Sequence, residues 1–287
     1  MILNETYTLS NDVTIPKLGL GTWFINNKDA AEAVRQAVRL GYRLIDTAQA
    51  YNNEVGVGEG IRTCGVPREE LFITSKIAAE AKSYEDAKKA IRDILSKTGL
   101  DYLDLIIIHA PQPWKKWRNK TQRYFSENVE VWHALEEAYK AGKVRAIGVS
   151  NFLEDDLQNI LEHCEIKPMV NQVLCHISNT PAQLISFCEN HDILVESYAP
   201  IAHGKMLKNK EVMSLADKYG VSVSQLCIRY DIQLGTVTLP KTANPVHMKE
   251  NAAVDFEISD ADMTALKKIT PIKGYGLLKL MPVFSGK

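Results

Sequence analysis

The sequence predicts an α/β protein of the (β/α)₈ TIM-barrel class, in which an N-terminal β-hairpin precedes the first barrel strand. Short β-branched apolar runs alternate with longer amphipathic segments eight times along the chain, and this alternation is typical of a parallel sheet covered by helices. The eight units follow one another without a linker or a shift in composition. This continuity favours a closed barrel over an open doubly wound sheet, and 287 residues suit one such barrel. We therefore expect residues 1–287 to form one domain.

The expected strands are short runs rich in β-branched and other apolar residues. Before the first of them, the stretch Tyr7–Ile15 contains a polar turn and predicts the hairpin. The eight barrel strands are expected at Leu18–Thr22, Arg43–Thr47, Leu71–Ser75, Leu105–His109, Val144–Ser150, Met169–Val173, Ile193–Ser197 and Thr236–Pro240.

Helices are expected between these strands because apolar residues recur there at helical spacing. In Asp29–Leu40, Ala30, Val34 and Ala37 follow this spacing, and Gly41 is placed to end the helix. The glycines of Gly56–Gly60 fall within an expected helix, which indicates close helix packing and not a dinucleotide-binding turn. The other expected helices are Val55–Thr63, Tyr84–Lys97, Glu127–Ala141, Glu154–Glu162, Pro181–Asn190, Val212–Lys218, Ser224–Leu234 and Asp260–Ile269.

Composition and charge exclude several classes of protein. Hydrophobic residues make up 45% of the chain and charged residues 24%, which supports a globular core and argues against disorder. The net charge is −1 without a basic stripe, so nucleic acid and anionic membranes are not expected partners. No secretory leader and no apolar window of about 18 residues is recognisable, so we expect a cytoplasmic protein without a membrane span.

The cysteines and histidines do not form ligand patterns. The five cysteines are odd in number and contain no CxxC pair, which predicts reduced thiols. The seven histidines contain no HxH or similar cluster. We therefore expect no metal site, and a barrel hydrolase or isomerase using Asp46 and His109 is the weaker enzyme reading.

Four reactive residues fall at the carboxyl ends of three consecutive expected strands. Asp46 closes the second strand and Tyr51 lies in the loop after it, Lys76 follows the third strand, and His109 ends the fourth. Each alone has an ordinary structural explanation, such as a solvated loop residue. Their occurrence at corresponding positions of successive units places them at one rim of the barrel, where barrel enzymes carry their chemistry.

This set of residues suits the reduction of a carbonyl group. Hydride transfer to the carbon puts negative charge on the oxygen, which Tyr51 could protonate as a general acid. A neighbouring Lys76 ammonium would lower the pKa of that phenol, and Asp46 would keep the lysine charged and oriented. His109 could donate a hydrogen bond that positions the substrate oxygen.

Short segments spread along almost the whole chain also resemble, in order, the sequence elements of one enzyme family. They are Asp46–Glu54, Ile73–Lys76, Leu103–His109, Gly148–Phe152, Asn171-Gln172, Tyr198-Ala199-Pro200, Leu239–Asn244 and Glu250-Asn251. The family is that of the aldo-keto reductases, and the short C-terminal loop is similar to that of microbial members such as 2,5-diketogluconate and methylglyoxal reductases.

The resemblance implies NAD(P)H-dependent reduction of aldehydes or ketones, with Asp46, Tyr51, Lys76 and His109 as the catalytic residues. It assigns the nicotinamide carboxamide to the Ser, Asn and Gln of these elements, ring stacking to the Tyr, and the adenosine end to the last two elements. The implied cofactor-binding residues are Gly21, Thr22, Ser150, Asn151, Gln172, Tyr198, Ala199, Pro200, Lys241, Thr242, Ala243, Asn244, His247, Glu250 and Asn251. The implied substrate-binding residues are Trp23, Tyr51, His109, Ala110 and Trp114. The expected partner is a small carbonyl compound, and the expected state is a monomer.

The chain departs from the family pattern at the adenosine end. His247 stands where many members have an Arg that clamps the 2′-phosphate, and a neutral imidazole is not a permanently charged bidentate ligand. Lys241 remains as a point charge. We expect NADPH as the cofactor, with NADH possible because of His247.

Other departures concern the substrate pocket. Ala110 replaces the Trp that often follows the catalytic His, so the pocket is expected to open or to be filled by another aromatic residue. Trp114 and Trp117 could line the mouth or simply pack within their loop. Ala199 replaces a Ser and loses one hydroxyl contact to the pyrophosphate. The short tail after Ile272 suggests a shallow, permissive pocket. A cofactor-binding sensor of the same fold is the alternative function, and sugars, dicarbonyls, keto acids and aromatic aldehydes stay open as substrates.

Overall fold

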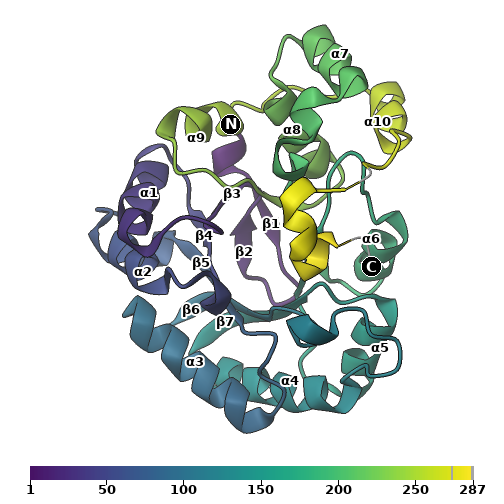
Figure 1. Cartoon of the computed structure of the whole chain (residues 1–287). Coiled ribbons are helices and arrows are strands. Elements are labelled where there is room, and N and C mark those ends of the chain that lie inside the picture. The colour runs from purple at the N-terminus through teal and green to yellow at the C-terminus, as the bar shows by residue number, and fades with distance from the viewer. Residues whose placement is uncertain (273, 286–287) are drawn as a thin grey trace.

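The computed structural model describes residues 1–272 and 274–285 and shows a ring of helices around a central barrel (Figure 1). Within these residues, eight parallel strands form one sheet whose order follows the chain. They are β3 (Gly19–Gly21), β4 (Leu44–Asp46), β5 (Phe72–Ile77), β6 (Leu103–Ile108), β7 (Val144–Ser150), β8 (Val170–Leu174), β9 (Leu194–Tyr198) and β10 (Val237–Leu239). The strands lie within a few residues of the predicted runs, and the predicted fold class is confirmed.

The sheet closes on itself between its first and last strands. The Thr238 amide donates to the Lys17 carbonyl at 2.9 Å, and the Gly21 amide donates to the Pro240 carbonyl at 3.0 Å. Parallel bridges join Leu18 to Thr238 and Gly21 to Lys241. The choice of a closed barrel over an open sheet is therefore correct.

Helices on the outside of the barrel follow most of the strands (Figure 1). Except for α9, which was not predicted, their bounds agree with the predicted segments to within two residues at each end. They are α1 (Asn27–Arg39), α2 (Glu54–Thr63), α3 (Tyr84–Thr98), α4 (Phe125–Lys140), α5 (Glu154–His163), α6 (Ala182–Glu189), α7 (Lys210–Tyr219), α8 (Val223–Gln233), α9 (Pro245–Ala252) and α10 (Asp260–Lys267). Among the described residues no helix is long and apolar enough to cross a bilayer.

Helix α9 is the element that the sequence reasoning missed. It begins at Pro245 after an Asn244 cap, whose side-chain oxygen accepts from the Val246 amide at 2.9 Å. Met248 and Asn251 are its buried residues. So short a helix with so little buried surface has no apolar stripe that periodicity could detect.

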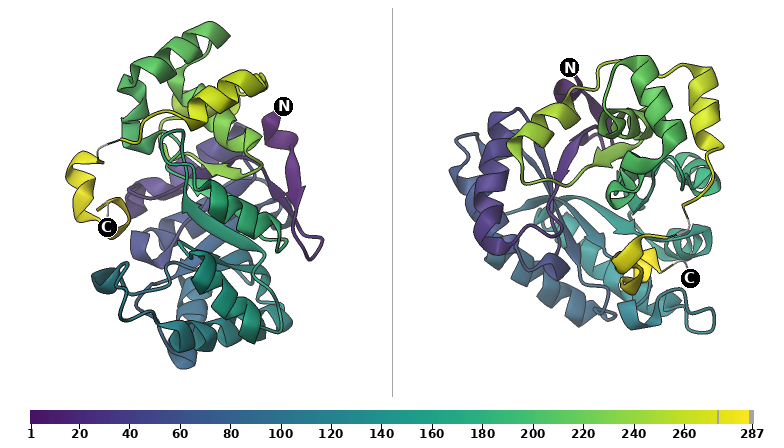
Figure 2. Two further views of the ribbon diagram at one scale, coloured as in Figure 1. Left: turned by 90° about the vertical axis from the view of Figure 1, so that its right-hand side faces the viewer. Right: turned by 45° about the horizontal axis from the view of Figure 1, so that its top comes forward.

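The N-terminal hairpin and the C-terminal segment cover opposite ends of the barrel, as the left view of Figure 2 shows. Strands β1 (Thr6–Thr8) and β2 (Thr14–Pro16) pair antiparallel, as predicted. The Asn11 amide side chain donates to the Arg145 carbonyl at 2.9 Å, at the start of β7. The hairpin therefore closes the amino ends of the strands and leaves the carboxyl ends free for a site.

The register of the strands decides which side chains point into the barrel. Residues paired in register on parallel strands share one face of the sheet. Ser150, Gln172 and Glu196 are paired in this way on β7, β8 and β9, and Asp46 is paired with Thr74 on β4 and β5. Polar residues thus face inward at the carboxyl ends, above a layer of buried aliphatic side chains.

Three glycines allow α2 to pack closely on its neighbours. A Cβ atom on Gly58 would lie 2.1 Å from the Thr98 carbonyl oxygen, and one on Gly56 would lie 2.0 Å from that of Asn27. Gly60 meets the backbone of Ala31 in the same way. The prediction that these glycines serve helix packing is confirmed.

We expect Gly58→Ala to destabilise the protein by roughly 1–3 kcal/mol through overpacking. This sign is diagnostic, because Gly→Ala inside an unobstructed helix stabilises by about 1 kcal/mol. Urea unfolding would measure the change, with Glu59→Ala on the exposed side of the same helix as the control, expected within about 0.5 kcal/mol of wild type. A more stable Gly58→Ala protein would contradict the packing argument.

Candidate active site

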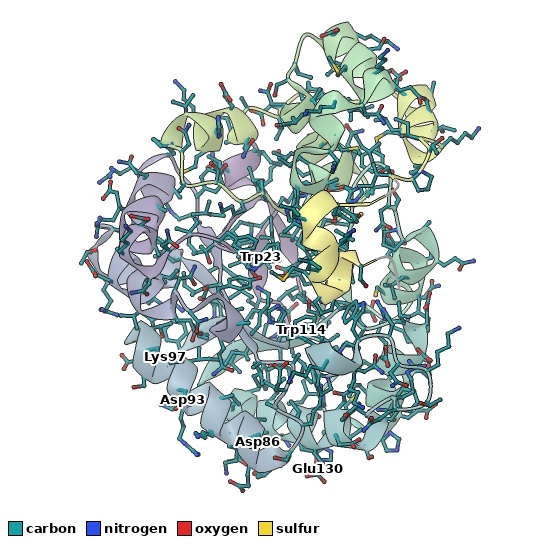
Figure 3. All side chains as sticks on the ribbon, in the orientation of Figure 1. Trp23, Asp86, Asp93, Lys97, Trp114 and Glu130 are labelled. Atoms are coloured by element: carbon teal, nitrogen blue, oxygen red, sulfur yellow. The ribbon has the colours of Figure 1, made fainter. Side chains whose placement is uncertain are left out.

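A cavity of about 760 Å³ opens at the carboxyl ends of the barrel strands. Trp23 and Trp114, labelled in Figure 3, lie near the centre of the ring beside the C-terminal segment. The residues predicted from the sequence that line this cavity are Gly21, Trp23, Asp46, Tyr51, His109, Trp114, Ser150, Asn151, Gln172, Tyr198, Ala199, Pro200 and Lys241.

A buried ion pair lies at the base of this cavity. The Lys76 ammonium donates to both carboxylate oxygens of Asp46 at 2.6 Å and to the Thr47 carbonyl at 2.8 Å. Lys76 is fully buried. An ammonium has three donors, so Asp46 at the end of β4 and Thr47 directly after it accept all the hydrogen bonds that Lys76 can donate. The predicted pairing of Asp46 with Lys76 is present in the structure.

Tyr51 lies directly above this ion pair. It ends a short 3₁₀ turn, Gln49–Tyr51, and the Lys76 nitrogen lies 5.1 Å from the centre of its ring. Burial, and then the charge of Asp46, raise the pKa of Tyr51 well above its usual value. The expected lowering by Lys76 is therefore not found, because Asp46 already neutralises that ammonium. Tyr51 is a protonated phenol that can donate a hydrogen bond or a proton.

Asn53 holds the loop that carries Tyr51. Its amide nitrogen donates to the carbonyls of Thr22 at 2.9 Å and Ile25 at 3.0 Å, and its oxygen accepts from the Thr47 hydroxyl at 2.7 Å. The loops after β3 and β4 are thereby tied together beneath the cavity.

His109 lies beside Tyr51, with the ring centres 5.8 Å apart and the rings nearly perpendicular. Burial, and then the Lys76 charge, lower the pKa of His109 well below its usual value. Its Nδ1 atom is buried and finds no hydrogen-bond partner among the described residues. The imidazole is therefore neutral at physiological pH, with one N–H to donate and no structural bond that competes for it.

Gln172 connects the ion pair to a carboxylate that the sequence reasoning overlooked. Its amide nitrogen donates to Asp46 Oδ2 at 2.9 Å and to Glu196 Oε2 at 2.8 Å. Glu196 is completely buried, and burial raises its pKa to about 7, with a further contribution from Asp46. The signal in the sequence was an acidic residue directly after three apolar residues within the predicted strand Ile193–Ser197.

Asn151 and Tyr198 form a second polar group across the cavity. The Tyr198 hydroxyl donates to Asn151 Oδ1 at 2.7 Å, and the Asn151 amide nitrogen donates to the His109 carbonyl at 3.0 Å. Asn151 also adopts a left-handed backbone conformation, with φ of 62°. Asn tolerates this conformation better than most residues do, which explains its place at the end of β7.

The remaining predicted cofactor residues lie outside the walls of the cavity. Thr22 is buried beneath it, where its hydroxyl donates to the Asp46 carbonyl at 2.9 Å. The others lie at or near helix α9, next to the rim residue Lys241. They are Thr242, Ala243, Asn244, His247, Glu250 and Asn251. His247 is exposed, whereas Asn251 is buried.

Trp114, and not the residue directly after His109, forms the cavity wall beside this histidine. Ala110 is fully buried and is not a cavity wall, although it was predicted to contact substrate. The ring of Trp114 instead lies edge-on to His109, with the centres 5.1 Å apart. Of the two expected outcomes, a more open pocket or another aromatic residue beside His109, the structure shows the second. Trp117 lines an adjoining cavity of about 270 Å³.

The C-terminal segment forms a wall of the cavity. Met281–Phe284 line it, and Phe284 is 2% exposed. The Phe284 ring packs 4.5 Å from that of His203 and 5.8 Å from that of Trp23. The expectation of a shallow pocket under a short tail is not met, because this tail reaches back over the mouth. Residues 273 and 286–287 of the tail lie outside the described residues.

Comparisons with known proteins identify close relatives. A sequence model described as the aldo/keto reductase family matches residues 17–271. The chain is 43% identical over 263 residues to the glyoxal reductase of Bacillus subtilis, covering 91% of each protein. It is 40% identical over 274 residues to the 9,11-endoperoxide prostaglandin H2 reductase of Trypanosoma cruzi, covering 94% of this chain and 93% of that one.

Solved structures of aldo-keto reductases also superpose on this chain. An aldo/keto reductase from Brucella melitensis superposes with a TM-score of 0.85 at 36% identity, covering 92% of this chain and 98% of that one. An aldo-keto reductase of Bombyx mori, solved in complex with NADP, superposes with a TM-score of 0.81 at 30% identity and covers 92% of each chain.

We expect Lys76→Met to lower the free energy of unfolding by about 3–5 kcal/mol, because it leaves the Asp46 carboxylate buried without its cation. The double variant Lys76→Met with Asp46→Asn removes that uncompensated charge and should recover part of the loss. Urea unfolding of the wild type, both single variants and the double variant would measure this coupling. Additive effects of the two substitutions would contradict it.

Proposed function

The chain belongs to the aldo-keto reductase family, and from this premise we propose that it reduces aldehydes and ketones with NADPH, using Tyr51 as the proton donor. The observation that carries the proposal is the placement of Tyr51 and His109 side by side over the Lys76–Asp46 ion pair, on the wall of one cavity. A protonated phenol and a neutral imidazole meet there, and both can donate to one carbonyl oxygen.

The residues around the cavity fit a nicotinamide dinucleotide. The amide nitrogen of Gln172 is committed to two carboxylates, which leaves its oxygen as the acceptor for a carboxamide. Tyr198 offers a ring on the cavity wall, and Lys241 at the rim has no ion pair among the described residues. A nicotinamide bound in this cavity would supply a hydride to the carbonyl carbon.

Residues of the protein then stabilise and protonate the negative charge that develops on the substrate oxygen. Tyr51 transfers its proton to that oxygen, a role that typically contributes roughly 10²–10⁴ in rate. His109 donates its free N–H to the same oxygen and orients it. The Lys76 ammonium lies 5.1 Å from the ring centre of this tyrosine and can attract the resulting phenolate, and Asp46 holds that ammonium in place. Trp23, Trp114 and Phe284 keep the site largely apolar.

Reactive dicarbonyl compounds and aromatic aldehydes are the substrates that we propose to test first. The B. subtilis relative is named as a glyoxal reductase, and the aromatic side chains of the cavity wall suit a planar apolar substrate. We further propose that the enzyme works as a monomer in a reducing cytoplasm, which its free cysteines support.

Tyr51→Phe should lower kcat for methylglyoxal or an aromatic aldehyde by about 10²–10⁴ because it removes the proton donor, while NADPH affinity stays near that of the wild type. NADPH oxidation and fluorescence titration would measure the two quantities. Tyr7→Phe, a half-buried tyrosine in the hairpin at the other end of the barrel, is the matched control and should retain activity. Binding of NADPH without turnover by the wild type would instead favour a sensor.

His247→Arg should raise the preference for NADPH over NADH by roughly tenfold, since an added charge-assisted hydrogen bond contributes about 1.5–3 kcal/mol. His247 is exposed on α9, so the substitution should not disturb the core. Dissociation constants of both cofactors for the wild type, His247→Arg and His247→Ala would test this. An unchanged ratio in His247→Arg would show that this position does not meet the 2′-phosphate.

A further inference from the structure

We infer that Glu196 is a positioning residue that acts through Gln172, and that it makes the balance between oxidised and reduced cofactor binding depend on pH. The inference rests on the proposed function, since it assumes that Gln172 faces the nicotinamide. Glu196 itself does not line the cavity.

The observation is a continuous chain of hydrogen bonds across the barrel. It runs from the Lys76 ammonium to Asp46 at 2.6 Å, from Asp46 to the Gln172 nitrogen at 2.9 Å, and from that nitrogen to Glu196 at 2.8 Å. One end of this hydrogen-bond chain lies on β4 and β5, and the other end lies on β8 and β9. Gln172 and Glu196 are paired in register, so both point inward.

The first consequence is a fixed orientation of the Gln172 amide. Two carboxylate oxygens accept from its nitrogen. Rotating the amide by half a turn would place its oxygen against both carboxylates, which is repulsive. Glu196 and Asp46 therefore present the amide oxygen, and not the nitrogen, to any carboxamide in the cavity.

The second consequence concerns charge. The charged groups that act on Glu196 are Asp46 from β4 and Lys76 from β5. Tyr198 lies two residues further along the same strand and therefore on the same face of the sheet. β8 contributes the neutral Gln172, and the register partner of Glu196 on β10 is the apolar Val237. Lys76 is thus the one cation among these groups, whereas there are two carboxylates. Glu196 Oε1 has no hydrogen-bond partner among the described residues.

Burial and Asp46 together place the pKa of Glu196 at about 7. The cluster of Lys76, Asp46 and Glu196 therefore changes from neutral to a charge of −1 as the pH rises through neutrality. This change occurs one hydrogen-bonded residue away from the face that Gln172 presents to the cavity.

The oxidised nicotinamide ring carries a positive charge, and the reduced ring does not. A core that becomes negative should therefore bind NADP⁺ more tightly relative to NADPH as Glu196 ionises. By linkage, NADP⁺ binding must lower the pKa of Glu196 and release a fraction of a proton near pH 7. The 2′-phosphate is common to both forms of the cofactor, so its contribution cancels in the ratio of the two affinities.

The test is to measure dissociation constants of NADP⁺ and NADPH by tryptophan fluorescence at pH 6, 7 and 8. In the wild type, the affinity of NADP⁺ relative to NADPH should rise about fivefold or more between pH 6 and pH 8. Glu196→Gln keeps the size and one oxygen acceptor and should give a ratio that is independent of pH. Glu136→Gln is the matched control, because Glu136 is also a buried glutamate but lies on α4, where it accepts from two backbone amides. This control should keep the wild-type slope.

A second measurement does not depend on any variant folding. Calorimetric titration of the wild type in two buffers of different ionisation enthalpy gives the protons released on binding, which should be more for NADP⁺ than for NADPH at pH 7. A ratio independent of pH in the wild type, equal proton release, or a slope that survives in Glu196→Gln would each overturn the inference. Failure to bind either cofactor would instead overturn the proposed function.

Discussion

The ion pair between Lys76 and Asp46 is the interaction on which the candidate site depends. Its atoms are 2.6 Å apart, and both side chains are buried among the ends of parallel strands. Burying one of these charges alone would cost several kcal/mol, so the two residues are tolerated only together and with further hydrogen bonds. The Thr47 carbonyl and the Gln172 amide supply those bonds, which ties β4, β5 and β8 into one polar unit at the mouth of the barrel.

This polar unit sets the protonation states of the residues above it. Because Asp46 neutralises Lys76, the ammonium does not hold Tyr51 as a phenolate, and burial keeps the pKa of Tyr51 high. The same burial keeps the pKa of His109 low. Both side chains therefore present donors to the cavity before any substrate arrives. A raised pKa of one group and a lowered pKa of its neighbour, both in one desolvated site, are typical of functional sites.

The walls of the cavity come from parts of the chain that are far apart in sequence. Trp23 follows β3, Trp114 lies after β6, and Phe284 belongs to the C-terminal segment. The rings of Trp23 and Phe284 pack 5.8 Å apart, so the loop after β3 and the C-terminal segment meet over the mouth of the barrel. Helix α9 carries His247, which is exposed and is not among the residues that line the cavity.

The sequence by itself determined the fold and which titratable residues meet at one rim of the barrel. Local periodicity specifies strands and helices, and the parallel alternation brings Asp46, Tyr51, Lys76 and His109 to one rim whatever the details of packing. Only the tertiary structure decided the pKa direction of Tyr51 and the hydrogen bond that Gln172 donates to Glu196. Both depend on burial and on neighbours contributed by other strands, as the bond between Gln172 and Asp46, 126 positions apart, illustrates. The same reason explains why helix α9 and the tail over the cavity were missed: their places are set by long-range contacts, which leave no periodic trace in the chain.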